Sequence, residues 1–303
     1  MNARQDNREA SGSSNQGLSV SAKELQEAQA ETRRIARSRR ENFVVASVFL
    51  PRKLRQHFYN VYALCRVADE LADETPSPAV ALDHLEEYQL QLDDAFAGRP
   101  QGSLFVALTH TIRQYDLAKQ SFDDLLTAFR QDQQVTRYAN DGQLDAYCRC
   151  SANPVGRIVL QFGGCLDERN GQLSDRVCTG LQLANFWQDV ARDYQIGRIY
   201  LPTDDMSRFG VVEEMLVAPT TPVELRQLLA SQCNRAEELL CSGLELARLV
   251  PAWLAKDVML FTHGGLETLN AIRAIDYDVL STRPVVSKWK QASLMLRACL
   301  NRL

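Results

Sequence analysis

Apolar residues recur at steps of three and four along most of this chain, which is the spacing of one face of an α-helix. Alternation with a period of two, which would indicate strands, is weak throughout. We therefore predict an all-α protein. Beginning with a helix that starts near Ser21, where Glu24 completes a capping-box pattern, the expected helices continue at 52–75, 79–97, 103–115, 121–133, 142–166, 172–195, 222–248, 252–275 and 286–301.

The composition is that of a globular enzyme rather than of a nucleic-acid binder. The 303 residues are 45% hydrophobic and carry a net charge of −4. The sequence contains neither an apolar run that could span a bilayer nor the apolar core of a secretory signal. The eight cysteines include no CxxC pair, so zinc is not expected. We predict a disordered segment at 1–22 and a single helical domain at 23–303.

Two interruptions are expected within the helical pattern. Asn153-Pro154-Val155-Gly156 lies inside a long apolar helix, where a proline removes an N–H donor and clashes with the preceding turn. The second interruption, from Gly197 to Pro202, follows an acidic stretch. We predict a kink at the first and a helix end at the second.

The first acidic motif contains Asp69 and Asp73, which are four residues apart. A helix places both carboxylates on one face, with Cβ atoms roughly 6 Å apart. A Mg²⁺ ion would compensate their repulsion, because it prefers oxygen ligands and shares them with substrate phosphates. An ordinary solvated helix face has the same pattern, so this pair alone does not decide. Arg66 is placed either to pair with Asp69 or to contact a diphosphate.

A second motif strengthens the metal hypothesis. Gln182, Asn185, Asp189 and Asp193 follow one another at steps of three, four and four, amid Leu, Phe, Trp and Val. Such a row of oxygen-bearing side chains is hard to explain as surface. Two rows facing each other across a helical bundle would hold several Mg²⁺ ions and an anionic leaving group.

These residues resemble the squalene/phytoene synthase family, whose members have an all-helical isoprenoid synthase fold with a central active-site cavity. The run from Tyr62 through Arg66 to Asp73 is similar to the family's first aspartate-rich motif. Asn185-x-x-x-Asp189-x-x-x-Asp193, followed by Gly197-Arg-Ile-Tyr-Leu-Pro202, is similar to the second. The resemblance extends from about Glu41 to Lys290.

Finer details resemble the bacterial members that make hydroxysqualene. They are Glu41-Asn42-Phe43, Ser151-Ala-Asn-Pro154 and Asn185-Phe-Trp-Gln-Asp189. Most other members have serine at the place of Asn42 and arginine at the place of Gln188. The family tyrosine expected in the C-terminal helix is absent near Gly264-Gly265, which would leave room for water or a bulkier, cyclopropane-bearing substrate.

The resemblance implies that presqualene diphosphate and water give hydroxysqualene and diphosphate, with several Mg²⁺ ions and without NADPH. It implies a dry cavity, for which Phe43, Tyr62, Tyr147, Phe186 and Trp187 are candidate wall residues; ordinary core packing is favoured for Phe186 and Trp187. The resemblance implies three sets of site residues. The catalytic residues are Asp69, Asp73, Asp189, Asp193 and Tyr147, and the metal ligands are Asp69, Asp73, Asn185, Asp189 and Asp193. The substrate contacts are Asn42, Tyr62, Arg66, Gln182, Asn185, Gln188, Arg198 and Tyr200.

Three other functions stay open at the level of sequence. They are head-to-head condensation of two farnesyl diphosphates, binding of a prenyl diphosphate without catalysis, and a helical regulator with acidic surface stripes. The expected partners are a prenyl diphosphate, neighbouring pathway enzymes and a membrane, with no nucleic acid. We expect a cytoplasmic protein that contacts the inner face of the cell membrane, through the basic stretch that contains Arg33, Arg34, Arg37, Arg39 and Arg40.

Overall fold

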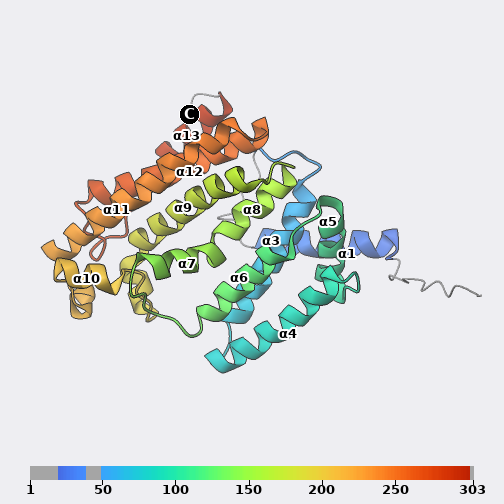
Figure 1. The fold of residues 1–303 in the computed structure, drawn as a ribbon, viewed down its shortest axis with the longest axis horizontal. Helices are drawn as coiled ribbons and strands as arrows, with labels where there is room; N and C mark the ends of the chain where they lie inside the picture. Colours follow the sequence, from blue (N-terminus) through green and yellow to red (C-terminus); the bar gives the residue numbers. More distant parts are fainter. Residues whose placement is uncertain (1–19, 39–48, 301–303) are drawn as a thin grey trace, which may run out of the picture.

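The computed structural model describes residues 20–38 and 49–300, and all regular structure in these ranges is helical (Figure 1). Asn42, Phe43 and most of the predicted disordered segment lie outside the described residues. The elements are α1 (Ala22–Ser38), α3 (Arg55–Asp73), α4 (Pro78–Phe96), α5 (Gly102–Tyr115), α6 (Lys119–Gln131), α7 (Asp141–Ser151), α8 (Asn153–Phe162), α9 (Glu168–Gln195), α10 (Thr203–Phe209), η1 (Glu213–Val217), α11 (Val223–Gly243), η2 (Leu244–Arg248), α12 (Ala252–Ala274) and α13 (Lys288–Cys299).

The all-α prediction is confirmed, and two short elements were not expected. Most predicted helices start and end within a few residues of the observed ones. The helix predicted near Ser21 begins at Ala22, and Ser21 Oγ accepts from the backbone N–H of Glu24 at 3.2 Å. The short helix α10 and the 3₁₀ turn η1 escaped prediction because one or two turns are too short to display a periodic apolar face.

The predicted kink separates α7 from α8. Ala152 ends α7, and Pro154 stands in the first turn of α8, where a missing N–H costs nothing. Asn153 is buried, and its Oδ1 accepts from Thr179 Oγ1 of α9 at 3.0 Å. A Cβ on Gly156 would lie 2.3 Å from Ser174 Oγ, so a glycine is needed where α8 approaches α9.

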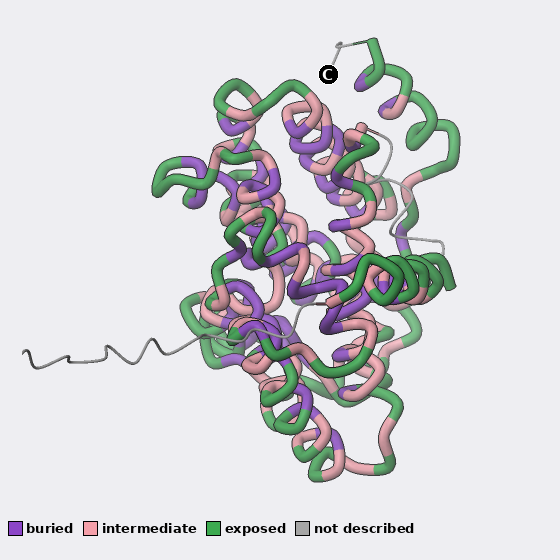
Figure 2. Tube along the Cα trace, turned by 90° about the vertical axis from the view of Figure 1, so that its right-hand side faces the viewer, coloured by how far each residue is buried: buried purple, intermediate pink, exposed green. Residues whose placement is uncertain are grey.

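The helix α9 is the central element of the bundle. It packs against α11, α12 and α8, and Figure 1 shows it between the α11–α12 pair and the α7–α8 pair. Leu183, Ala184 and Trp187 of α9 are buried in the largest apolar cluster, together with Leu228 and Leu229 of α11. Buried segments accordingly run through the middle of the molecule, and exposed ones lie at its rim (Figure 2).

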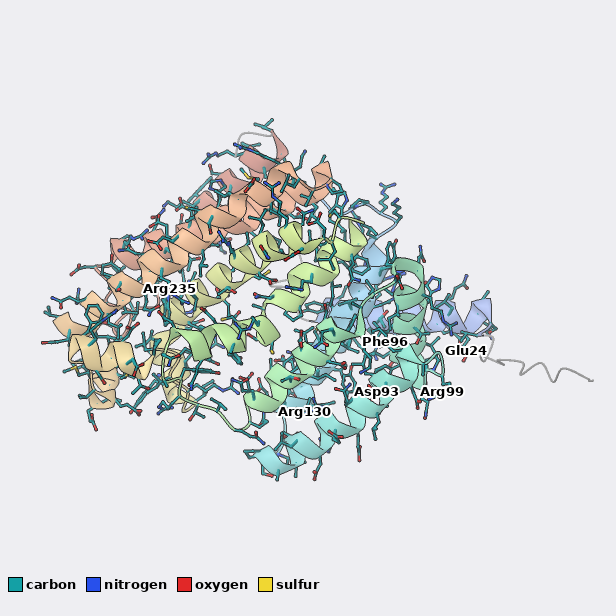
Figure 3. The ribbon with its side chains drawn as sticks, viewed as in Figure 1. Glu24, Asp93, Phe96, Arg99, Arg130 and Arg235 are labelled. Carbon is teal, nitrogen blue, oxygen red and sulfur yellow. The ribbon has the colours of Figure 1, made fainter. Side chains whose placement is uncertain are left out.

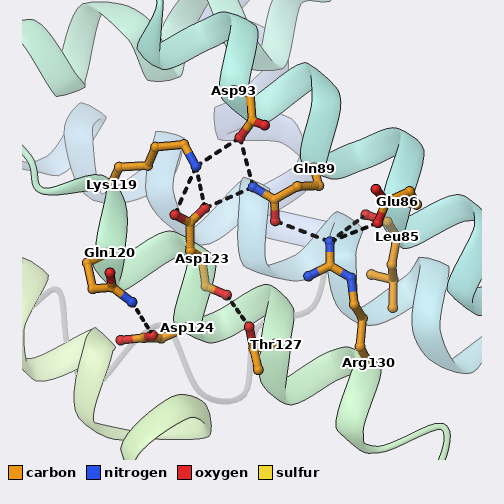
Figure 4. A network of polar contacts seen from close by, with 10 residues as sticks. All are labelled: Leu85, Glu86, Gln89, Asp93, Lys119, Gln120, Asp123, Asp124, Thr127 and Arg130. Carbon is orange, nitrogen blue, oxygen red and sulfur yellow. Dashed lines mark hydrogen bonds and ion pairs between the residues drawn. The ribbon is translucent and has the colours of Figure 1, made fainter.

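Polar contacts join several of the outer helices to their neighbours. Lys119 of α6 contacts Asp93 of α4 at 2.9 Å and Asp123 at 2.7 Å, and Gln89 donates to both carboxylates (Figure 4). On the opposite side, Arg235 of α11 lies 2.5 Å from Asp145 Oδ1 of α7 (Figure 3). The first network therefore joins α6 to α4, and the second joins α7 to α11.

Candidate active site

The first acidic motif occupies the last turns of α3. Asp69 is half-buried and Asp73 is exposed. Arg66 forms an ion pair with Asp69 and a second one, at 2.9 Å, with Glu70. Its guanidinium is largely buried, which suits a cation that offsets the mutual repulsion of neighbouring carboxylates.

The second motif occupies the last turns of α9, where Gln182, Asn185, Asp189 and Asp193 form the predicted stripe. Arg283, in the loop between α12 and α13, forms an ion pair with Asp189, at 2.5 Å to Oδ1 and 3.0 Å to Oδ2. The same guanidinium donates to Gln188 Oε1 at 3.1 Å. Gln188 also donates to the carbonyl of Pro284 at 2.6 Å, so both of its contacts fasten this loop to α9.

Arg198 lies between the two motifs. Its Nη2 is 3.9 Å from Asp73 Oδ1 of the first motif and 3.4 Å from the carbonyl of Asp132. Gly197 directs the chain there: it has a φ of +82°, which only glycine adopts without strain, and it follows the end of α9. The two acidic motifs, more than a hundred residues apart in sequence, therefore share one end of the bundle.

A cluster of buried aromatic side chains lies next to Arg198. Tyr200 stacks on Phe186, with ring centres 3.7 Å apart, and Tyr147 lies 5.9 Å from Tyr200. Tyr147, Tyr200 and Phe186 are all buried, as is Trp187. Core packing, the favoured interpretation for Phe186 and Trp187, is what the structure has. Tyr147 and Tyr200 belong to the same buried cluster rather than to an open wall.

Burial and charge act together on the carboxyl groups of the site. Burial, with the nearby Asp189 charge, raises the pKa of Asp193 to about 7, although Arg198, Arg192 and Arg283 oppose the shift. Burial also raises the pKa of Asp132, against the effect of Arg198. Burial is the largest cause of both shifts, and a cation added beside these carboxyl groups would favour their ionised forms.

The donor set fits Mg²⁺ held jointly with a diphosphate. Among the described residues, no three His, Cys, Asp or Glu side chains gather closely enough to enclose a metal ion by themselves. Mg²⁺ usually takes one or two carboxylates and completes its shell with substrate phosphates and water. Asp69 and Asp73 on one helix, and Asn185, Asp189 and Asp193 on the other, offer that kind of ligand.

A cavity of about 430 Å³ opens one turn away from the motifs. The lining residues nearest in sequence to the first motif are Tyr62 and Cys65 of α3, next to Arg66. The one nearest to the second motif is Leu181 of α9, one turn before Asn185. Its other lining residues come from α3, α6, α8, α9, η2 and α12 and are nearly all apolar. Of the predicted wall aromatics, Tyr62 lines this cavity, and a Cβ on Gly264 of α12 would meet open space.

Sequence reasoning missed two groups at this site, Arg283 and Asp132. Arg283 contacts Asp189 across 94 residues, and only its position between Thr282 and Pro284 in a polar segment marks it. Asp132 ends α6 without any partner motif nearby in the sequence. Neither residue has a local spacing that could have identified it.

Comparison with known proteins shows the family and the fold. The sequence profile described as squalene/phytoene synthase matches residues 36–290, most of the chain. The chain belongs to the squalene/phytoene synthase family. A phytoene synthase from Arthrospira platensis is 30% identical over 278 residues, covering 86% of this chain and 88% of the relative.

Solved structures of the squalene/phytoene synthase family share the fold. The squalene synthase HpnC from Alicyclobacillus acidocaldarius is 41% identical, with a TM-score of 0.82, and the match covers 86% of this chain and 98% of that one. A dehydrosqualene synthase is 28% identical, with a TM-score of 0.81, covering 92% and 98%. The predicted isoprenoid synthase fold is therefore confirmed. Within the described ranges, no helix is long and apolar enough to cross a membrane.

Proposed function

We propose that this chain converts presqualene diphosphate and water into hydroxysqualene and diphosphate. The observation that carries the squalene branch of this proposal is the 41% identity with the squalene synthase HpnC over 98% of that chain. The capture of water rests on the resemblance of Asn185-Phe-Trp-Gln-Asp189 to the members that make hydroxysqualene. The identity is 30% with the phytoene synthase and 28% with the dehydrosqualene synthase. Gln188 adds support, because it binds the 283–284 segment where the resemblance gives most other members an arginine.

In the proposed reaction the C–O bond to the diphosphate breaks, the cyclopropylcarbinyl cation rearranges, and water adds its oxygen while losing a proton. Asp69, Asp73, Asn185, Asp189 and Asp193 would hold Mg²⁺, which when bound would supply the positive charge that makes diphosphate a better leaving group. Among the described residues the Arg198 guanidinium makes two long contacts, with Asp73 and with the carbonyl of Asp132, so its N–H groups remain able to donate to the departing oxygens.

The same elements protect the cation. The cavity next to Tyr62 is lined almost entirely by apolar side chains, so few nucleophiles can reach the cation before it rearranges. The Tyr62 ring at its mouth offers an electron-rich face to a positive carbon. A Cβ at Gly264, near the place of the missing family tyrosine, would meet nothing within 4 Å among the described residues.

The test is a product assay on the purified protein. One reaction contains presqualene diphosphate and Mg²⁺ in H₂¹⁸O, without NADPH. A parallel reaction contains farnesyl diphosphate under the same conditions. Organic extracts of both are analysed by mass spectrometry. We expect ¹⁸O-labelled hydroxysqualene from presqualene diphosphate and no product from farnesyl diphosphate. Turnover of farnesyl diphosphate would move the chain to the condensing branch of the family.

Matched aspartate variants belong to the same assay. Asp69→Asn and Asp189→Asn remove one carboxylate from each motif and should each lower turnover on the order of 100-fold or more. Asp83→Asn, an exposed carboxylate on α4, should leave turnover unchanged. A protein that binds the diphosphate without turnover would instead be the catalytically silent member, and unchanged binding and turnover in both variants would favour the regulator.

A further inference from the structure

The apolar cavity contains one carboxyl group that the proposed chemistry does not use. Asp257 of α12 lines the cavity and is 5% exposed. It is the one acid among the described residues that line this space. The other polar groups that line the cavity are hydroxyls and thiols, those of Tyr62, Ser174, Cys65 and Cys178.

Nothing among the described residues explains why this carboxyl is buried. Its Oδ1 is inaccessible to solvent and has no hydrogen-bond partner within the described part of the chain. The adjacent Lys256 lies over the Phe49 ring, 5.6 Å from its centre. Burial alone raises the pKa of Asp257 to about 7, with no contribution from a neighbouring charge.

The helix itself does not need an aspartate at this position. A carboxylate stabilises a helix when it lies in the first turn, near the positive end of the helix dipole. Pro251 is the N-cap of α12, so Asp257 lies beyond that turn. A buried polar group without a partner lowers the stability of the fold. An unpaired carboxyl kept in the wall of an apolar cavity points to a role toward whatever fills that cavity.

Asp257 lies at the end of the cavity remote from the acidic motifs. Early in α12, Leu254 packs with Leu173, which lies near the start of α9. Later in α12, a Cβ on Gly265 would lie 2.9 Å from Leu181 Cδ2, further along α9. The helices α12 and α9 therefore run in the same direction. Asp257 precedes Gly265 by eight residues, and Asn185 follows Leu181 by one turn. At 1.5 Å per residue, roughly 18 Å of helix separates the carboxyl from the level of Asn185.

We propose that Asp257 limits the length of the prenyl chain that the cavity accepts. The inference rests on the proposed function only for the class of ligand, a prenyl diphosphate whose head is bound at the acidic motifs. The cavity has room for a water molecule against the part of the Asp257 carboxyl that lines it, although Oδ1 itself stays closed to solvent. A tail that stops short leaves this water in place. A longer tail displaces it and sets the carboxyl against hydrocarbon, so the longer ligand binds more weakly.

The test measures binding and needs no turnover. Titration calorimetry with Mg²⁺ compares the non-hydrolysable thiolodiphosphate analogues of farnesyl and geranylgeranyl diphosphate. We expect the wild-type protein to prefer the farnesyl analogue. Asp257→Leu should raise the affinity for the geranylgeranyl analogue on the order of tenfold, with a much smaller change for the farnesyl analogue. Asp257→Asn, which stays polar but loses the charge, should lie between them.

Two controls keep the outcome decisive. Ser174→Ala removes a different buried polar group from the same cavity and should change both affinities equally. Asp257→Leu should also raise the melting temperature, because it removes an unpaired carboxyl; a lower melting temperature would make Asp257 a structural residue. Equal effects of Asp257→Leu on both analogues would overturn the inference. Failure of both analogues to bind the wild-type protein would overturn the inference and, with it, a prenyl diphosphate as the class of ligand, whereas normal binding without hydroxysqualene would overturn the proposed function alone.

Discussion

Asp193 and Asp257 have pKa values raised to the same level for different physical reasons. For Asp193, burial and the Asp189 charge raise the value, while three arginines oppose them. For Asp257, burial acts alone. Because burial is the one cause that acts on Asp257, its ionisation is the simpler one to follow by experiment.

Asp257 should make the folded protein less stable as the pH rises from about 4 to about 7. In this range the folded carboxyl, with a pKa of about 7, keeps a proton that the unfolded chain, with a value of 3.8, has lost. Stability falls with pH wherever the unfolded state binds fewer protons, by up to about 1.4 kcal/mol per pH unit for one group. Asp257→Asn should therefore lose less stability between pH 5 and pH 8 than the wild-type protein, by roughly 1–3 kcal/mol.

Urea unfolding at several pH values measures this difference. Asp193 remains in both proteins, so its contribution in the same pH range cancels in the comparison. Asp83→Asn, at an exposed position, should follow the wild-type curve. Parallel curves for the wild-type protein and Asp257→Asn would mean that the carboxyl is ionised and solvated in the folded state.

At the scale of elements, the loop between α12 and α13 acts on the end of α9. Arg283 binds both oxygens of Asp189, and the Pro284 carbonyl accepts from Gln188. The guanidinium therefore takes a position from which it neutralises a proposed metal ligand. A metal ion that reaches Asp189 has to compete with this ion pair.

Arg283→Gln should strengthen metal binding in the absence of diphosphate. Loss of the guanidinium leaves Asp189 and Asp193 with less compensating charge, which favours an added cation by an estimated threefold to tenfold. Electron paramagnetic resonance of Mn²⁺ titrated into the protein measures free metal directly. Arg99→Gln, which breaks an ion pair with Asp94 on the far helix α4, should leave the affinity unchanged. Unchanged or weaker Mn²⁺ binding in Arg283→Gln would show that the ion pair does not compete with the metal.

The same scale explains what the sequence could and could not predict. The stripe from Gln182 to Asp193 was predictable because its spacing is a property of a single helix. The break at Asn153-Pro154 was predictable because proline has no N–H. The pairing of Arg283 with Asp189 and the unpaired carboxyl oxygen of Asp257 could not be predicted. Both arise from contacts between segments far apart in the sequence, on which local periodicity carries no information.

At the scale of the whole molecule, α1 is a part of the bundle as well as a basic segment. Thr32 is fully buried, and its Oγ1 donates to Asn60 Oδ1 of α3 at 2.6 Å. Arg33 donates to Gln56 Oε1 of α3 at 2.6 Å, yet it remains exposed, as do Arg34 and Arg37. Removing the whole N-terminal region would therefore disturb the core, and charge substitutions are the better probe of membrane contact.

Replacing Arg33, Arg34 and Arg37 together by glutamine should weaken binding to anionic vesicles. The chain as a whole carries a net charge of −4, so attraction to such a surface depends on a local basic face. Each arginine near an anionic membrane contributes about 1 kcal/mol, so the triple variant should bind phosphatidylserine-containing vesicles on the order of 100-fold more weakly. Sedimentation with vesicles at two salt concentrations measures the effect, which should shrink as salt screens the charges.

The matched control replaces three other exposed arginines, Arg99, Arg169 and Arg208, each of which has an acidic partner close by. It removes the same total charge while leaving α1 intact. If vesicle binding depends only on the net charge of the protein, both triple variants lose the same affinity. If α1 is the contact, the control variant binds nearly as well as the wild-type protein does. Equal affinity of the α1 variant and the wild-type protein would remove α1 from the membrane contact and leave the substrate to reach the cavity by another face.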